Sequence, residues 1–313
     1  MKKKLFLALS YLTIALSVHA DDFCYSDCST DCFGFDSVLT FDIGGGYRND
    51  SLKWDIFPST DPGSRVEEKW KNIGLGIVEA NAQFLACEHY LLKADFDFGW
   101  FTNNGSQSYI RTGGAELPQN LKSSPRGNAY NLSGAIGYQF NFDRFRVSFA
   151  PLVGYSYSQQ RFKSRTYKNE IIPTAAHILA HNDYKFRWSG PWVGFALAYQ
   201  ANCELQLYFD YSYHWSRFHG TVKEHFLFNE LPTGGFPESN LHSNNAYGNE
   251  FTVGGTYTFC DYWFIGVKFD YKQFSGNKGK SIVDDDKEDL EDSRLRKLNW
   301  ESSTITMDIG YTF

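Results

Sequence analysis

Apolar and polar residues alternate along ten separate segments of the chain. The pattern is clearest in 89–100, and in 298–313 it continues up to Phe313. Alternation with a period of two is typical of strands that have one apolar face. Each segment is long enough to cross a bilayer as a tilted strand. The ten segments are 36–49, 70–86, 89–100, 127–141, 144–157, 184–200, 204–215, 246–259, 262–274 and 298–313.

The connections between these segments differ in length at the two ends. Tight turns are expected at Cys87-Glu88, Phe142-Asp143, Ala201-Asn202 and Cys260-Asp261. The other five connections are long, at 50–69, 101–126, 160–183, 218–245 and 275–297.

Short turns at one end and long loops at the other are typical of outer-membrane barrels. The sequence therefore predicts an all-β fold, a ten-stranded antiparallel transmembrane β-barrel over 36–313. Its last strand, 298–313, should pair with both 262–274 and 36–49. A soluble β-sandwich is the alternative, but its strands are usually shorter and its dry core excludes charges.

One segment changes its phase. Tyr184, Phe186 and Trp188 share one parity, whereas Val193 and the apolar residues that follow it have the other. A β-bulge at Ser189-Gly190-Pro191 would explain this switch.

The N-terminus has the pattern of an export signal. Three lysines precede an apolar stretch from Leu5 to Val18, and small residues follow at a cleavage position. This predicts a signal peptide over 1–20, since the apolar stretch is short for the alternative, a membrane anchor. The segment 21–35 would then be a cysteine-bearing periplasmic N-terminus.

Charge and composition fit a membrane location. The net charge is −6, and it becomes −9 when the three lysines of the signal peptide are removed. Nucleic-acid binding is therefore not expected. Aromatic residues make up 18% of the chain and are expected on strand faces and at membrane interfaces. The expected partner is outer-membrane lipid, with the long loops extracellular.

The second face of the strands should line the lumen of the barrel. Ten strands make a narrow barrel, and side chains of mixed charge would close it largely by salt bridges. Free diffusion is not expected through it, so that any activity would be in the loops. The predicted lumen charges are Lys93, Asp95, Asp97, Arg146, Arg187, Asp210, Lys268, Asp270, Lys272 and Asp308.

Six cysteines are expected on the periplasmic side, where export makes disulfides plausible. Their 15 possible pairings leave two alternatives open. They could staple the N-terminal segment to the turns, or they could cross-link the chain to other envelope proteins. A zinc site in the N-terminal group lacks a fourth ligand. The disulfide candidates are Cys24, Cys28, Cys32, Cys87, Cys203 and Cys260.

No cofactor or metal is expected. His177 and His181 are four residues apart, but a metal would need a third ligand. The acidic run 284–292 lacks the spacing of a calcium loop and is expected to be a solvated loop.

Several segments resemble the omptins, a family of ten-stranded outer-membrane proteases: YKFRWSGPWVGFALAYQ at 184–200, DSLKW at 50–54 and the final GYTF. The resemblance implies a water activated by an Asp-His pair in the fourth loop and opposed by two aspartates in the second. By position, His225 is a weak catalytic candidate. However, Lys223 stands where the family has its aspartate, and the second loop has no paired acids. A histidine without an orienting carboxylate is a poor general base, so a working protease is not expected.

A second resemblance is to the outer-membrane proteins of chlamydia-like bacteria, the group named after Protochlamydia. The cysteine-bearing N-terminus, the aromatic-rich barrel and GGGYRNDSLKWDI at 44–56 are similar. The resemblance implies an abundant, non-enzymatic surface protein, structural or porin-like. The terminal Phe313 also resembles the signal for the barrel-insertion machinery. An adhesin that acts through Phe226, Phe228 and Phe236 of the fourth loop is an alternative.

Overall fold

The computed structural model describes residues 37–57, 65–102, 106–112, 119–122, 125–166, 180–225, 238–259, 262–284 and 291–313. The expected signal peptide and the cysteine-bearing N-terminal segment lie outside these residues.

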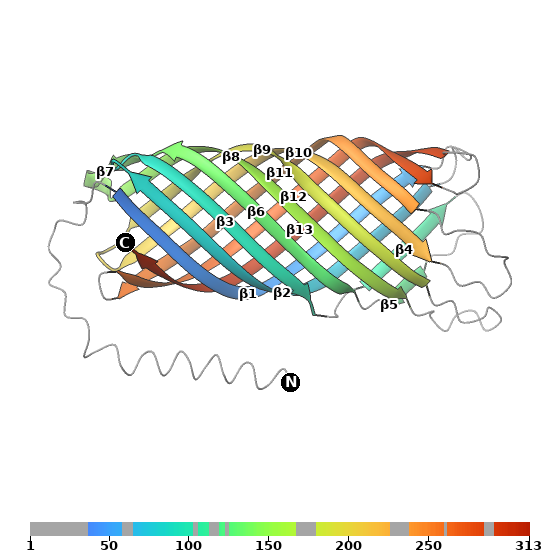
Figure 1. Ribbon diagram of the computed structural model, residues 1–313, viewed down its shortest axis with the longest axis horizontal. Coiled ribbons are helices and arrows are strands. Elements are labelled where there is room, and N and C mark those ends of the chain that lie inside the picture. The colour runs from blue at the N-terminus through green and yellow to red at the C-terminus, as the bar shows by residue number, and fades with distance from the viewer. Residues whose placement is uncertain are drawn as a thin grey trace, which may run out of the picture.

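Ten long antiparallel strands close into one barrel, which confirms the predicted fold (Figure 1). The order around the barrel is β1-β13-β12-β11-β10-β9-β8-β6-β3-β2, and β2 pairs back with β1. The strands are β1 (Ser37–Phe57), β2 (Arg65–Ala86), β3 (Tyr90–Phe101), β6 (Arg126–Tyr138), β8 (Val147–Thr166), β9 (Ala180–Gln200), β10 (Leu205–His225), β11 (Glu238–Phe259), β12 (Trp263–Asp284) and β13 (Glu291–Thr312).

The barrel closes at the last strand, as predicted. β13 pairs with β12 on one side and with β1 on the other. The backbone N–H of Phe313 donates to the carbonyl of Leu39 at 2.8 Å. On the outer face, Ile305 and Met307 are 55% and 52% exposed, as expected for side chains in contact with lipid. The half-apolar C-terminal strand is therefore the seam of the barrel, and neither of its edges is left open.

Two short turns have the geometry that their sequences favour. Cys87 and Glu88 both have positive φ, 49° and 62°, which matches the primed turns of tight hairpins. In the turn after β9, the Asn202 side chain accepts bonds from the backbone N–H groups of Glu204 and Leu205. The predicted turn at 142–143 follows β7 (Phe140–Phe142) and is a 3-10 turn, η1 (Asp143–Phe145).

Most strands are longer than predicted. β8 has 20 residues and β13 has 22, whereas about 9–11 suffice to cross a bilayer. Much of each predicted long loop is therefore strand, and a hairpin of β4 (Ser106–Thr112) and β5 (Gln119–Lys122) lies within the second. β4 and β5 lie at the end of the barrel opposite β7 and the C-terminus (Figure 1). We call these the long-loop end and the short-turn end.

The predicted bulge in β9 is wrong. The register of β8 with β9 is unbroken from Val147 to Thr166. Instead, the apolar side changes from one face to the other. Trp188, at the long-loop end, is 2% exposed and points inward, whereas Val193 is 41% exposed on the outer face. The strand stays regular, and its surroundings change from lipid to water.

Real irregularities occur elsewhere. The β1–β2 register shifts between Asp50 and Leu52, where Asn72 of β2 has a φ of 56°. The β10–β11 register shifts between Ser216 and Phe218. No helix among the described residues is long and apolar enough to cross a membrane.

Candidate functional site

The lumen is crossed by ion pairs between strands that are not neighbours. Lys93 of β3 contacts Asp210 of β10 at 2.6 Å, and Lys268 of β12 contacts Glu79 of β2 at 3.1 Å. These pairs tie opposite walls of the barrel together. Eight of the predicted lumen charges lie on this inner face: Lys93, Asp95, Asp97, Asp210, Lys268, Asp270, Lys272 and Asp308.

The other two predicted lumen charges, Arg146 and Arg187, are not in the lumen. Arg146 caps η1 in a left-handed conformation and donates to the carbonyl of Ala201 at the short-turn end. Arg187 lies on the outer face and donates to Gln159 at 3.1 Å, because the inward side chains on either side of it are Phe186 and Trp188. The expected bulge had assigned Arg187 to the wrong face.

A buried arginine forms the upper limit of the polar lumen. Arg48 is 2% exposed and donates twice to Asp50, at 2.8 Å each. Gln160, from the far side of the barrel, donates to the same carboxylate at 2.7 Å. Asp97 lies 3.7 Å from the guanidinium, which also sits 5.2 Å from the centre of the Trp300 ring. Sequence reasoning missed this cluster, because the predicted strand ended at residue 49.

A buried histidine lies at the same level. The ring nitrogens of His214 lie 3.0 Å from the Ser156 hydroxyl and 2.8 Å from the Ser212 hydroxyl. Glu250 lies 3.6 Å from it and contacts Lys272 at 2.7 Å. Both ring nitrogens therefore have partners, as in a satisfied structural histidine. The alternation of β10 places His214 on the lumen face, and this was the only sequence signal for it.

Below Arg48 the lumen carries an excess of acid. Of the described inner-face residues at and below this level, nine are acidic and four are basic. The acids are Asp42, Asp50, Glu79, Asp95, Asp97, Asp210, Glu250, Asp270 and Asp308; the bases are Arg48, Lys93, Lys268 and Lys272.

Above Arg48 an aromatic layer fills the barrel. Trp188 of β9 meets Trp300 of β13 at 6.1 Å between ring centres, and Trp54 of β1 meets Phe186 at 5.3 Å. These strands are not neighbours, so the rings meet across the lumen. All ten barrel strands contribute a buried apolar side chain to this cluster. Its aromatic members are Trp54, Trp70, Phe101, Phe162, Tyr184, Phe186, Trp188, Phe218, Phe274 and Trp300.

The aromatic layer also holds a carboxylate. The Trp70 indole and the Tyr184 hydroxyl donate to the same oxygen of Glu68, at 2.9 and 2.8 Å. Glu68 is 2% exposed, and these charge-assisted bonds orient the two rings. The layer is thus fixed by specific bonds as well as by packing.

The outer wall at the long-loop end carries a basic face, which we define as Arg126, Arg161, Lys163, Lys185, Arg187 and Arg217. Arg161 lies directly opposite Lys185, and Arg126 lies opposite Lys163. Such like-charge pairs destabilise a sheet unless an anion screens them. Partial burial, followed by Arg187 and Arg161, lowers the pKa of Lys185. Lys163 contacts Asp183 at 3.1 Å, the only acid that ion-pairs with this face among the described residues.

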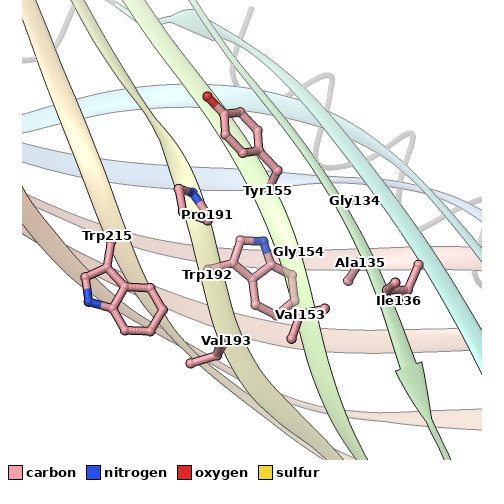
Figure 2. Close-up of a pocket in the computed structure, with 10 residues that line it drawn as sticks. All are labelled: Gly134, Ala135, Ile136, Val153, Gly154, Tyr155, Pro191, Trp192, Val193 and Trp215. Atoms are coloured by element: carbon pink, nitrogen blue, oxygen red, sulfur yellow. The ribbon is translucent and has the colours of Figure 1, made fainter.

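An apolar hollow of about 530 Å³ lies in the outer wall below the basic face, over β6, β8, β9 and β10 (Figure 2). Figure 2 shows Tyr155 and Trp215 near its rim, with Trp192 between them. Gly134 leaves space on the outer face, and Pro191 is part of the lining. Ile136 and Val153, also in the lining, are 58% and 52% exposed. The hollow therefore faces the lipid.

The remaining predicted positions are only partly within the described residues. Cys87 and Cys203 are exposed, free thiols at short turns. The backbone of His225 pairs with that of His181, at the ends of β10 and β9. In the described ranges, no group of three or more His, Cys, Asp or Glu side chains could hold a metal. Outside these ranges lie Cys24, Cys28, Cys32, Cys260, His177, Phe226, Phe228 and Phe236.

Comparison with known families matches residues 42–313 to the model of the Protochlamydia outer membrane protein, Pom. The chain belongs to this family. The match covers nearly the whole barrel of this Pom protein, from β1 to Phe313. No curated protein matches it in sequence.

Solved structures support the barrel fold of this Pom protein. The outer-membrane protease OmpT of Escherichia coli aligns with a TM-score of 0.72 at 15% identity, over 91% of this chain and 100% of OmpT. The outer membrane protein OprG of Pseudomonas aeruginosa aligns with a TM-score of 0.32 at 12% identity, over 88% of this chain and 95% of OprG. At such identities the OmpT likeness shows the fold alone, and the OprG alignment adds no argument.

Proposed function

We propose that this Pom protein is a non-enzymatic, non-conducting structural protein of the outer-membrane surface. The observation that carries this proposal is the aromatic layer, to which every barrel strand contributes. A diffusion pore needs a hydrated path, and an interior filled by packed rings such as Trp188 and Trp300 offers none. The family match and the barrel fold support an outer-membrane location.

Planar-bilayer recording tests this proposal. The refolded full-length protein is expected to insert and give no stable conductance steps. Heat-modifiable migration on a gel serves as the control that the barrel has folded. Reproducible single-channel steps from folded protein would contradict the structural assignment and favour the porin-like alternative.

The partner that we propose for the outer wall is phosphate-bearing outer-membrane lipid. The basic face begins just beyond the last outward apolar side chains, among them Tyr155 and Trp215, at the level of lipid headgroups. The like-charge pair Arg161–Lys185 would be relieved by an anion between the two side chains. The apolar hollow below would hold one acyl chain of the same lipid. Charge and shape therefore support one amphiphile.

Removing charge from the basic face should weaken this contact. The triple variant R161Q/R187Q/R217Q in detergent is expected to bind short-chain phosphatidylglycerol about 100-fold less tightly, since each basic residue near a charged surface contributes about 1 kcal/mol. Binding of phosphatidylcholine should not change. The control K69Q/K71Q removes two lysines from β2, outside the basic face, and should bind like wild type. Displacement of phosphatidylglycerol by inorganic phosphate alone would assign the face to a free anion.

We also propose that cysteines at the short turns link the chain to other envelope proteins. Cys87 and Cys203 are exposed and unpaired. On a non-reducing gel of native envelopes, the protein is expected in oligomers that collapse to monomer with reductant. C87S/C203S should reduce these oligomers. Monomer alone without reductant would sink the cross-linking proposal.

An omptin-like protease is not favoured. Lys223, which stands where the omptins have their aspartate, is exposed and lies opposite Asp183 and Glu238 in the sheet. The two acids at the predicted spacing, Asp95 and Asp97, lie in the lumen below the aromatic layer. They are therefore far from the strand end at His225. Cleavage of dibasic peptides that is lost in H225A would overturn this view.

A further inference from the structure

Two histidines lie opposite each other on the outer face, beside the basic face. The Nδ1 atoms of His219 on β10 and His242 on β11 are 2.8 Å apart, with the rings at 85°. A bond between two ring nitrogens needs one N–H donor and one unprotonated acceptor. While this contact exists, at least one of the two imidazoles is therefore neutral.

The charged groups around the pair are basic. His219 lies opposite Arg187 of β9, and Arg217 precedes it on β10. His242 lies opposite Lys280 of β12. The outward neighbours on β11, such as Asn240, carry no charge. Partial burial, followed by His242, Arg187 and Arg217, lowers the pKa of His219.

We propose that this histidine pair makes the basic face acid-sensitive, so that proton uptake separates the rings and strengthens binding of phosphate-bearing lipid headgroups. The inference rests on the lipid contact proposed above. Each proton adds positive charge beside Arg187 and Arg217, and an anion between them offsets the repulsion. Because the neighbours disfavour protonation of the free protein, the change is driven by acid and by the anion together.

The sign of the effect follows from linkage. A ligand that binds the protonated pair more tightly must raise the pKa of the pair, and acid must in turn raise the affinity for that ligand. Phosphatidylglycerol is a suitable probe, because its phosphodiester keeps one negative charge from neutral to mildly acidic pH. Each added charge near a charged headgroup is expected to increase affinity about fivefold.

The test compares lipid binding by the full-length protein in detergent at about pH 7.5 and about pH 5, on either side of the ordinary histidine pKa. Affinity for phosphatidylglycerol should rise between about 5- and 25-fold in acid, and that for phosphatidylcholine should not. H219Q/H242Q should lose this rise but keep the affinity of wild type at pH 7.5. The control H89Q, at the short-turn end, should keep the rise.

A second readout isolates the pair from the lipid. By NMR of the ring nitrogens without lipid, the His219 pKa should rise in H242Q, because one of the groups that lower it has been removed. An unchanged acid response in H219Q/H242Q would overturn the inference and leave the lipid contact standing. Equal binding of both lipids at both pH values would overturn the lipid contact, and the NMR result would then report on the pair alone.

Discussion

Replacing Trp188 by alanine is expected to lower the free energy of unfolding by about 3–5 kcal/mol, the usual range for a buried tryptophan. Trp188 is 2% exposed and contacts Phe218 of the next strand and Phe274 and Trp300 from across the lumen. Its removal leaves a cavity that β-strands locked in a closed barrel cannot collapse to fill. Urea unfolding in phospholipid vesicles, followed by circular dichroism, measures the change.

The matched control is Trp215→Ala. Trp215 is 51% exposed and lies on the outer wall, where lipid can occupy the vacated space. A smaller loss is therefore expected for Trp215 than for Trp188. Equal losses in the two variants would contradict the assignment of Trp188 to a packed interior.

The same layer makes a prediction about conductance. The triple variant W54A/W188A/W300A, if it still folds, should give conductance steps where wild type is silent. The lumen below is rich in carboxylates, so these steps should favour cations. Silence from the folded variant would show that the aromatic layer is not the main barrier.

Alternation predicted the barrel because lipid-facing residues leave a readable pattern. In 262–274 and 298–313, apolar side chains face lipid and polar ones face the lumen, so that the strands and their pairing could be derived. The upper halves could not be derived by the same rule. There Leu52 and Trp54 point inward, and Lys53 between them points out to water. The alternation continues with its polarity inverted, and inverted alternation resembles an amphipathic loop.

Contacts across the lumen could not be predicted from alternation at all. Lys93 and Asp210 are each recognisable as lumen charges, but their 2.6 Å contact depends on strand tilt and stagger. Arg187 shows the opposite failure, in which a single wrong assumption about a bulge moved a charge to the wrong face. That error concealed the basic face, because Arg187 lies at its centre, opposite Gln159 and His219.

The second large effect is expected at Arg48. Arg48→Ala should lower the free energy of unfolding by about 3–5 kcal/mol, because removing one partner of a buried ion pair leaves an uncompensated charge. Asp50, itself 2% exposed, would keep only the Gln160 bond, and Asp97 would lose its nearby cation. The double variant R48M/D50N should recover part of the loss, since it removes both charges together.

The control for Arg48 is an exposed ion pair on the same barrel. Lys163 and Asp183 are 3.1 Å apart, and their side chains are 67% and 35% exposed. Lys163→Ala should therefore cost about 1 kcal/mol or less. High salt should reduce the cost for Lys163 but not for Arg48, because only the exposed pair is screened by solvent ions. Equal salt dependence of the two variants would contradict the burial of the Arg48 cluster. If R48M/D50N is no more stable than Arg48→Ala, the loss comes from packing of the arginine against Trp300.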